Sequence, residues 1–553
     1  MTTTRLTRWI RKAVPGPFAV TVRKKLRVPM DDGVELLADL ITPTHGADPR
    51  LPTIVIRGPY GRSGPVAAQA RALARAGFTV LFQSCRGTWG SGGVFTPQVD
   101  EQRDGIATHR WVRSQPWATA TVATFGTSYM GYTQWAVAGR LCAQEPAHAP
   151  DALCLITTMP DFGAVTWDNG AFALRNALGW TQLMDRMAHR EFGALLLGMR
   201  GPDRKLRSGF DTLPLADGDI AATGRRVHWY QDWVAHESLT DDYWTSQSHT
   251  ADVTHVTAPV YMITGWYDIF LPWQLRNYAQ LAAAGRPPRL TIGPWGHLSR
   301  GLGATAVEES AAFLRERFAV APDTRVAPVR AYLTGARQWH DLTAWPPPGV
   351  RTEPAYLHRR GAIGPERPDG GVTEYVYDPA DPTPAVGGPS LEPRCVPLDN
   401  AAHERRDDVV VFRGDSLPEP VIVAGEPVAR IGFRSGRPGA DVFVRLCDIH
   451  PDGRSMTVCD GIRRIGAVTG TDPEPDADGF REVEVRLWPA FHRFAAGHRI
   501  GVQISSGAHP RYARNPGNGE PAVTATTLHR ATQQISHSPT APARIDLPVW
   551  SRR

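Results

Sequence analysis

The chain has 553 residues, of which 42% are hydrophobic and 21% are charged, and its formal net charge is +6. This length exceeds what one hydrophobic core organises, so several domains are expected. The 61 basic and 55 acidic residues are interspersed, which argues against a nucleic-acid partner, and no run approaches the ~18 apolar residues of a membrane helix.

The N-terminal segment is basic, and residues 15–17 (PGP) interrupt its short apolar stretch. A secretory signal needs an uninterrupted apolar core, so we predict none and expect a cytoplasmic protein. An amphipathic surface anchor over residues 5–13 is the alternative. The six cysteines form no CxxC motif and show no zinc-ligand spacing. We therefore expect buried free thiols and no metal, with a Cys447–Cys459 disulfide left open.

The first third of the chain alternates between strand and helix patterns. Runs rich in β-branched residues predict strands over residues 34–43, 51–60, 78–87 and 119–126. Helical spacing predicts helices over 66–77 and 100–116, the first ending at Gly77 and the second broken by Pro116. This alternation indicates a largely parallel sheet with helices on both faces.

The rest of the chain changes pattern twice. Residues 146–246 lose the strand signal and show helical spacing, which predicts a helical insertion. Strand patterns return over 258–268 and 288–297. After Trp345, short alternating runs predict an antiparallel all-β domain, a sandwich or jelly roll. The predicted division is an α/β core in two parts (1–145 and 247–345), a helical cap (146–246) and a C-terminal β domain (346–553).

A candidate nucleophile lies in the segment TFGTSYMGY, between a predicted strand and a predicted helix. In α/β hydrolases the nucleophile occupies a strained strand-to-helix turn, and a small residue two positions earlier, here Gly126, lets the backbones approach. The usual G-x-S-x-G pattern fails at Met130, and the next glycine is Gly131. Ser128 is therefore either a nucleophile or one more hydroxyl in a glycine-rich loop.

Two further residues follow in the order that this fold requires, an acid and then a histidine, each just past a strand. Asp268 follows one predicted strand and His297 follows the next, where side chains project into the crevice above a parallel sheet. Asp268 as a helix N-cap and His297 as a satisfied loop histidine are the alternatives. The shared order favours a triad with Ser128.

An acyl-transfer site also needs donors for the oxyanion. The backbone N–H of Tyr129, directly after the nucleophile, is the first candidate. The second is the phenol O–H of Tyr60, in the loop after an earlier strand. Simple packing of Tyr60 in that loop is the alternative.

With these motifs the chain resembles the cocaine-esterase and X-prolyl dipeptidyl aminopeptidase family of serine hydrolases (CocE/NonD type). The matching segments are VPMDDGVELLADLITP, RGPYGR, CRGTWGSGG, FGTSYMGYTQW, GWYDIF, GPWGH, VRLCDIHPDGRSMTVCDGIRRI and GHRIGVQISSGAHPRYARNPGNGE. The family form of the turn, G-x-S-Y-x-G, accommodates Met130. The resemblance implies an α/β-hydrolase core with a helical cap and a C-terminal jelly roll, the same triad and oxyanion donors, and no cofactor or metal.

The resemblance also bears on the substrate. Family members select substrates with the cap and with the residue two past the acid, which predicts a pocket lined by Trp167, Phe172 and Phe270; aromatic walls favour an apolar or aromatic acyl group. Trp167 and Phe172 as plain cap core is the alternative. Relatives that hydrolyse α-amino acid esters carry carboxylates just after the acid, where this chain has Ile269 and Phe270.

We expect an acyl-ester hydrolase acting on a small-molecule substrate, without nucleic-acid or membrane partners. The alternatives are an amide-bond hydrolase of the X-Pro dipeptidyl-peptidase or β-lactam acylase type, an acyltransferase, and a non-catalytic carbohydrate-binding protein. Relatives sometimes dimerise, so a homodimer stays open.

Overall fold

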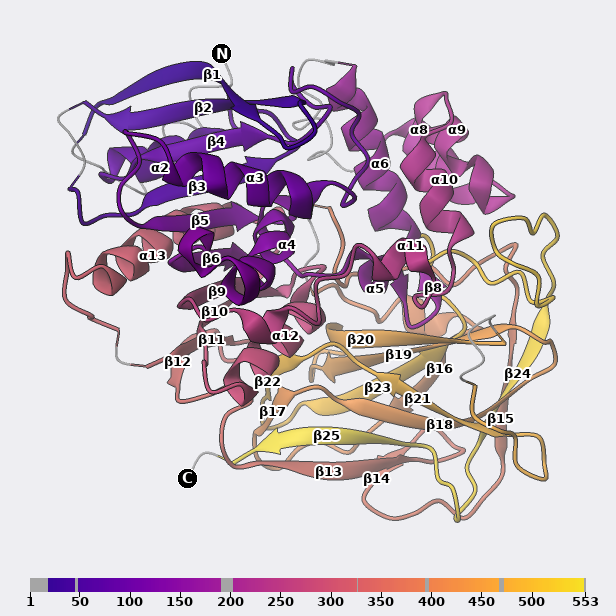
Figure 1. The fold of residues 1–553 in the computed structure, drawn as a ribbon. Helices are drawn as coiled ribbons and strands as arrows, with labels where there is room; N and C mark the ends of the chain where they lie inside the picture. Colours follow the sequence, from indigo (N-terminus) through magenta and orange to yellow (C-terminus); the bar gives the residue numbers. More distant parts are fainter. Residues whose placement is uncertain are drawn as a thin grey trace. The chain divides into compact units, whose positions relative to one another are not determined.

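The computed structural model describes residues 18–44, 48–189, 202–325, 327–392, 397–466 and 472–551. The chain separates into two compact units: Met1–Phe162, Met187–Phe192 and Tyr243–Arg330 form the first, and Gly163–Arg186, Gly193–Asp242 and Ala331–Arg553 form the second (Figure 1). The domain boundaries given above stay predictions, and the anchor predicted over residues 5–13 lies outside the described residues. No described helix has both the length and the hydrophobicity to cross a membrane.

The first unit is built on a mostly parallel sheet. The strands of this ten-stranded sheet that lie wholly within the first unit are β1 (Val20–Pro29), β2 (Glu35–Pro43), β3 (Thr53–Gly58), β4 (Val80–Ser84), β5 (Val122–Thr127), β6 (Ala152–Ile156), β9 (Val260–Tyr267) and β10 (Arg289–Gly296). Their order is β1-β2-β4-β3-β5-β6-β9-β10. From β4 to β10 every neighbouring pair is parallel, whereas β1 and β2 pair antiparallel. The predicted α/β core is confirmed.

Helices cover both faces of this sheet. They include α2 (Ala68–Arg75), α3 (Glu101–Arg113), α4 (Tyr129–Gln144), α12 (Leu271–Ala283) and α13 (Arg300–Arg317). Successive residues of β3 point to opposite faces. Ile54 and Ile56 pack in the cluster that contains α2 and α13 residues, whereas Val55 packs in the cluster that contains α3 residues.

The second unit combines the helical insertion with the C-terminal strands. Its helices include α6 (Leu174–Ala188), α8 (Arg204–Asp211), α9 (Gly218–Thr223) and α10 (His228–Ala235). One sheet holds β13 (Val350–Leu357), β14 (Ile363–Gly364), β15 (Val372–Tyr377), β17 (Val421–Gly425), β18 (Val428–Ser435), β21 (Arg481–Arg486), β22 (Ala490–Phe494), β24 (Ala531–Ser536) and β25 (Arg544–Trp550). A four-stranded sheet follows the order β16 (Val410–Arg413), β23 (Arg499–Ser505), β19 (Ala440–Ile449) and β20 (Ser455–Ile465). The strand pairs in these two sheets are antiparallel, which confirms the predicted antiparallel β domain. The helices α6, α8, α9 and α10 confirm the predicted helical insertion.

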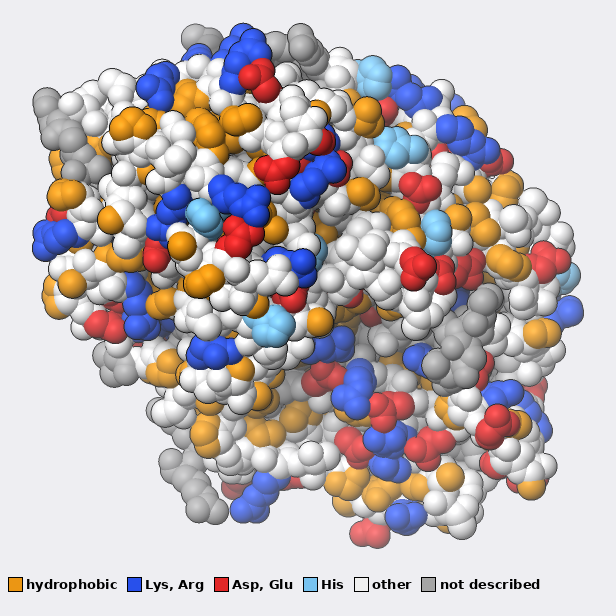
Figure 2. Space-filling model, viewed as in Figure 1, with side chains coloured by type: hydrophobic (Ala, Val, Ile, Leu, Met, Phe, Trp, Pro, Cys, Tyr) orange, Lys and Arg blue, Asp and Glu red, His pale blue; other side chains and the backbone are white. Residues whose placement is uncertain are grey.

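The structure tests the prediction that the cysteines are buried free thiols. Cys447 and Cys459 are buried free thiols, so the disulfide left open by the sequence is not formed. Cys395 lies outside the described residues. The face drawn in Figure 2 shows basic and acidic side chains interspersed, as the composition predicts.

Candidate functional site

Ser128 lies on a strained turn between β5 and α4. β5 ends at Thr127 and α4 begins at Tyr129, and Ser128 has φ 62° and ψ −126°. A residue with a side chain rarely adopts this conformation, which costs on the order of 1–3 kcal/mol and persists only where surroundings enforce it. Here the Ser128 N–H donates to the Ile156 carbonyl (3.0 Å) and the Thr158 hydroxyl donates to the Ser128 carbonyl (2.8 Å). This strained strand-to-helix turn is the geometry that a nucleophile requires in this fold, and the role of Ser128 stays a prediction.

The glycines of this turn are explained by close approach. A Cβ on Gly126 would lie 2.4 Å from the Met130 carbonyl oxygen, and one on Gly131 would lie 2.5 Å from the Thr158 side chain. Position 130 carries no such restriction, since the Met130 side chain instead packs over Gly58. The departure from G-x-S-x-G therefore has a steric reason: the second glycine is needed at 131.

Asp268 and His297 form a buried pair. His297 Nδ1 lies 2.8 Å from Asp268 Oδ2, and the other Asp268 oxygen accepts the Phe270 N–H at 2.8 Å. Both carboxylate oxygens are thus held, and the side chain is fully buried. Helix α12 begins at Leu271 with Phe270 as its N-cap, so Asp268 is not the cap that the alternative interpretation requires.

Ser128, Asp268 and His297 share one edge of the sheet, because they follow the carboxyl ends of the parallel strands β5, β9 and β10. Within the described chain no hydrogen bond links the Ser128 hydroxyl to the His297 ring. The structure therefore brings two of the three predicted residues into contact and places the third at the same edge.

A chain of aromatic rings runs from α4, the helix that follows Ser128, to His297. Phe162 packs against Tyr132 of α4 (ring centroids 5.1 Å apart) and against Phe270 (6.0 Å). Phe270 in turn meets the His297 ring edge-on at 5.1 Å. Phe270 thus contacts the predicted base directly, and Phe162 is a contributor that the sequence did not single out.

The two predicted oxyanion donors belong to well-anchored segments. Tyr129 is the first residue of α4, where backbone N–H groups have no acceptor within the helix. Tyr60 follows β3 in a loop whose Pro59 carbonyl accepts the Trp89 indole N–H at 2.9 Å. These contacts place both donors on fixed backbone; their direction toward a substrate stays a prediction.

The Tyr129 side chain points away from solvent into a buried polar network. Its hydroxyl donates to Glu101 Oε1 (2.9 Å) and accepts the Gln98 N–H (2.8 Å). The other Glu101 oxygen accepts from Arg57 (3.0 Å) and from the Cys85 thiol (3.4 Å). Every member is at least nine-tenths buried, so the network fixes the start of α4 from behind.

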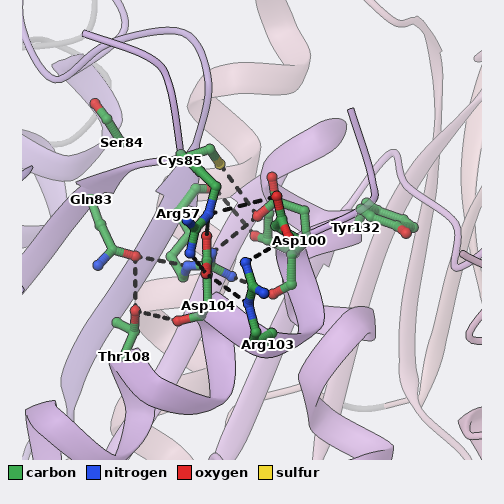
Figure 3. Close-up of polar contacts among 12 residues, drawn as sticks. Arg57, Gln83, Ser84, Cys85, Asp100, Arg103, Asp104, Thr108 and Tyr132 are labelled. Atoms are coloured by element: carbon green, nitrogen blue, oxygen red, sulfur yellow. Dashed lines mark hydrogen bonds and ion pairs between the residues drawn. The ribbon is translucent and has the colours of Figure 1, made fainter. Parts of the chain in front are cut away.

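Burial decides the protonation of this network. It raises the pKa of Glu101, and the Arg57 guanidinium opposes that shift. Burial, reinforced by the Glu101 charge, holds the pKa values of Tyr129 and Cys85 well above their usual ranges. Both groups therefore keep their protons and serve as donors. Arg57 also donates to Gln83 at 2.8 Å, a contact drawn in Figure 3.

Arg86, the residue after Cys85, is paired with two carboxylates. Its guanidinium donates two hydrogen bonds to Asp104 (2.6 and 2.9 Å) and also pairs with Asp32 (2.9 Å).

The sequence held one signal of the Glu101 network. Arg57 is a lone charge in the apolar strand TIVIRG, and a buried arginine requires an acidic partner.

The predicted cap residues are core residues of the second unit. Trp167 and Phe172 are almost fully buried, with ring centroids 4.9 Å apart, and the Trp167 indole N–H donates to the Trp233 carbonyl at 2.8 Å. Asp168, beside them, accepts the Tyr512 hydroxyl at 2.7 Å. These contacts favour the packing interpretation, while a role of Trp167 and Phe172 in substrate binding stays a prediction.

Comparison with known proteins covers nearly the whole chain. Residues 32–299 match the family model of the X-Pro dipeptidyl-peptidase (S15 family), and residues 324–546 match that of the X-Pro dipeptidyl-peptidase C-terminal non-catalytic domain. The chain is 30% identical to a cocaine esterase of Rhodococcus sp. (strain MB1 Bresler), over 98% of this chain and 100% of that protein.

Two solved structures share the fold. An aminopeptidase from a marine sediment archaeon, Thaumarchaeota archaeon, superposes with a TM-score of 0.83 at 24% identity, covering 97% of each chain. An α-amino acid ester hydrolase superposes with a TM-score of 0.79 at 23% identity, covering 96% of each chain.

Proposed function

Since the chain belongs to the cocaine-esterase and X-Pro dipeptidyl-peptidase family of serine hydrolases, we propose that it cleaves small acyl esters, with Ser128 as nucleophile, His297 as general base and Asp268 as the acid that orients His297. The observation that carries this proposal is the buried His297–Asp268 pair at the sheet edge where Ser128 occupies its strained turn.

The mechanism uses only groups of this chain. His297 removes the Ser128 proton as Oγ attacks the acyl carbonyl, and Asp268 stabilises the resulting imidazolium through Nδ1. The oxyanion accepts hydrogen bonds from the Tyr129 N–H and the Tyr60 O–H; loss of one such donor costs roughly 3–4 kcal/mol of transition-state stabilisation. His297 then protonates the leaving alcohol, and water releases the acyl group by the reverse sequence.

The position of Phe270 favours an ester substrate with an apolar or aromatic acyl group. Its ring is buried and meets the His297 ring edge-on, so it borders the acyl group when His297 acts on Ser128 as proposed. Ile269 and Phe270 leave no carboxylate directly after Asp268 to hold a substrate ammonium, which disfavours α-amino acid esters. Amide hydrolysis of X-Pro substrates is the second candidate, because both family models carry that name.

A substrate panel tests the proposal. Purified protein is assayed with 4-nitrophenyl acetate, butyrate and benzoate and with an alanyl-prolyl 4-nitroanilide. We expect turnover of the esters, with kcat/KM for the benzoate above that for the acetate, and loss of ~10⁴-fold or more in kcat for Ser128→Ala and His297→Gln. His255→Gln, which alters an exposed histidine elsewhere in the first unit, should leave kcat unchanged. Preference for the anilide would select the peptidase alternative, and equal rates for wild type and Ser128→Ala would reject Ser128.

A further inference from the structure

Imidazole and carboxylate groups gather in the second unit where β19 ends and its antiparallel neighbour β23 begins. β19 and β23 pair with Asp448 opposite Ile500 and Ile449 opposite Arg499. Continuing this register by one residue sets His450 opposite His498. Side chains two residues apart on a strand share a face, so Asp448 lies on the same face as His450. The pairing of the strands thus gathers one carboxylate and two imidazoles.

The contacts confirm this gathering. Asp448 Oδ1 lies 2.8 Å from His498 Nδ1, and Asp448 Oδ2 lies 3.7 Å from His450 Nε2. The two imidazole rings lie 4.4 Å apart, centroid to centroid. Each of the three residues offers a ligand atom, and these atoms all lie within 4.8 Å of one another.

The surroundings hold the cluster in place. From the neighbouring sheet, His492 Nε2 lies 3.1 Å from Asp448 Oδ2, and its Nδ1 lies 2.9 Å from the Thr334 hydroxyl. The backbone of His498 is fixed as well, because its N–H donates to Ala495 and its carbonyl accepts from Leu417. The Asp448 side chain is 3% exposed, whereas His450 and His498 are 25% and 18% exposed, so the carboxylate is buried and the imidazoles are reachable from solvent.

We infer that Asp448, His450 and His498 form a binding site for a divalent transition-metal ion, with Zn²⁺ the best match. Two imidazoles and one carboxylate are ligands that Zn²⁺ and its neighbours prefer, whereas Ca²⁺ and Mg²⁺ require mainly oxygen ligands. Ligand atoms around a tetrahedral zinc ion lie roughly 3.4 Å apart for bonds of about 2.1 Å. The part-exposed His450 ring can supply the required approach, and water can fill the fourth position.

The proposed ion would tie the end of β19 to the start of β23, and His492 would orient the carboxylate from behind, as outer partners of metal ligands do. One cation lies beside the cluster: Arg454 Nη2 is 3.4 Å from His450 Nδ1, and the Arg454 charge is offset by Asp452 at 2.8 Å. The site belongs to the second unit alone and does not depend on the proposed esterase activity.

Metal titration of the full, untagged chain tests this inference. Protein freed of metal with EDTA is titrated with Co²⁺, whose visible d–d absorption reports imidazole coordination, and then with Zn²⁺ as competitor. We expect one saturable site per chain, displacement of Co²⁺ by Zn²⁺, and a rise in the melting temperature on Zn²⁺ addition. His450→Ala and His498→Ala should each weaken binding ~10-fold or more and remove the thermal shift.

His255→Ala is the matched control, because His255 also pairs with an aspartate, Asp252 at 3.4 Å, but outside the cluster. It should bind Co²⁺ as wild type does. A cooperative thermal unfolding transition in every metal-free variant reports that the chain is folded. The inference is overturned if wild type shows no saturable Co²⁺ band, or if both cluster variants bind with the wild-type dissociation constant.

Discussion

Tyr129 joins the proposed reaction centre to the interior of the first unit. Its backbone N–H is the first oxyanion donor of the proposal, and its side chain reaches the opposite way to Glu101 and the Gln98 N–H. A backbone donor is useful for catalysis only if it is fixed before the charge develops. The buried hydroxyl is therefore expected to matter for turnover although it never meets the substrate.

Tyr129→Phe tests this link at the scale of one atom. The change leaves the Gln98 N–H without its acceptor and removes one donor from buried Glu101, so we expect a loss of about 1–3 kcal/mol in the free energy of unfolding. We also expect kcat to fall while KM changes little. Denaturant unfolding and steady-state kinetics measure the two effects. Tyr356→Phe, on a part-exposed tyrosine of β13, is the control and should change neither; an unaltered kcat in Tyr129→Phe would refute the positioning role.

Helix α4 is the element on which the proposed site depends, because Ser128 lies directly before its first residue and its first turn packs against the loop that follows β6. Gly131 packs tightly against Thr158, just past β6, because a Cβ at 131 would lie 2.5 Å from the Thr158 side chain. Any side chain at 131 must push the helix or the loop aside, and the Ser128 backbone is hydrogen-bonded to that same loop.

Gly131→Ala should therefore destabilise the protein despite the higher helix propensity of alanine. The added Cβ would lie 2.5 Å from Thr158, and overpacking of this kind costs typically about 1–3 kcal/mol. Gly179→Ala on α6 is the matched control, since its Cβ would meet only Leu206 at 3.9 Å and alanine gains up to about 1 kcal/mol in a helix. Thermal unfolding compares them. The steric account would be wrong if both variants gained stability.

The sequence predicts the elements of the first unit well, because strand and helix patterns alternate there and glycine and proline residues, such as Gly77 and Pro116, mark where the helices end. Helix 66–77 corresponds to α2, and the helix predicted to break at Pro116 ends at Arg113. Ser128, Asp268 and His297 could be proposed from the glycine-flanked turn motif, from their order at strand ends and from the family resemblance. The Glu101 network was missed although the arginine in TIVIRG hinted at it, since its members lie on β3, α3 and α4 and in the loops after β4 and before α3, and they meet only through folding. The histidine cluster was missed for the same reason: His450 and His498 are neighbours only once β19 and β23 pair.

Across the described residues, several histidines are buried deeply enough that burial outweighs any acidic group near them, which couples stability to pH. Burial lowers the pKa of His249 to about 4 and, together with the nearby Arg57 and Arg113, that of His109 to about 3. The hydrogen-bond partners of His249 are those of a neutral imidazole. The Tyr132 hydroxyl donates to the Gln247 carbonyl, so the Tyr132 oxygen accepts from His249 Nε2, and His249 Nδ1 accepts from the Gln102 amide. Both histidines are expected to be neutral in the folded state.

Acid should therefore destabilise the protein before its carboxylates titrate. A histidine with a depressed folded-state pKa binds a proton first in the unfolded chain, so its contribution is full above pH ~6.5 and is lost as pH falls toward its folded value. For His249 the loss between pH 7 and pH 5 is about 2 kcal/mol. In His249→Gln, denaturant unfolding should show a drop smaller by that amount, whereas exposed His255→Gln should behave as wild type. Equal drops in all three proteins would show that His249 titrates normally.

The most direct measurement for the account as a whole is the site of covalent modification by a fluorophosphonate, located by peptide mass spectrometry. The account predicts one adduct, on Ser128, formed in wild type and absent in Ser128→Ala, and formed much more slowly in His297→Gln. An adduct on another serine, or none on a protein that hydrolyses esters, would contradict the assignment of Ser128, His297 and Asp268 as one catalytic unit.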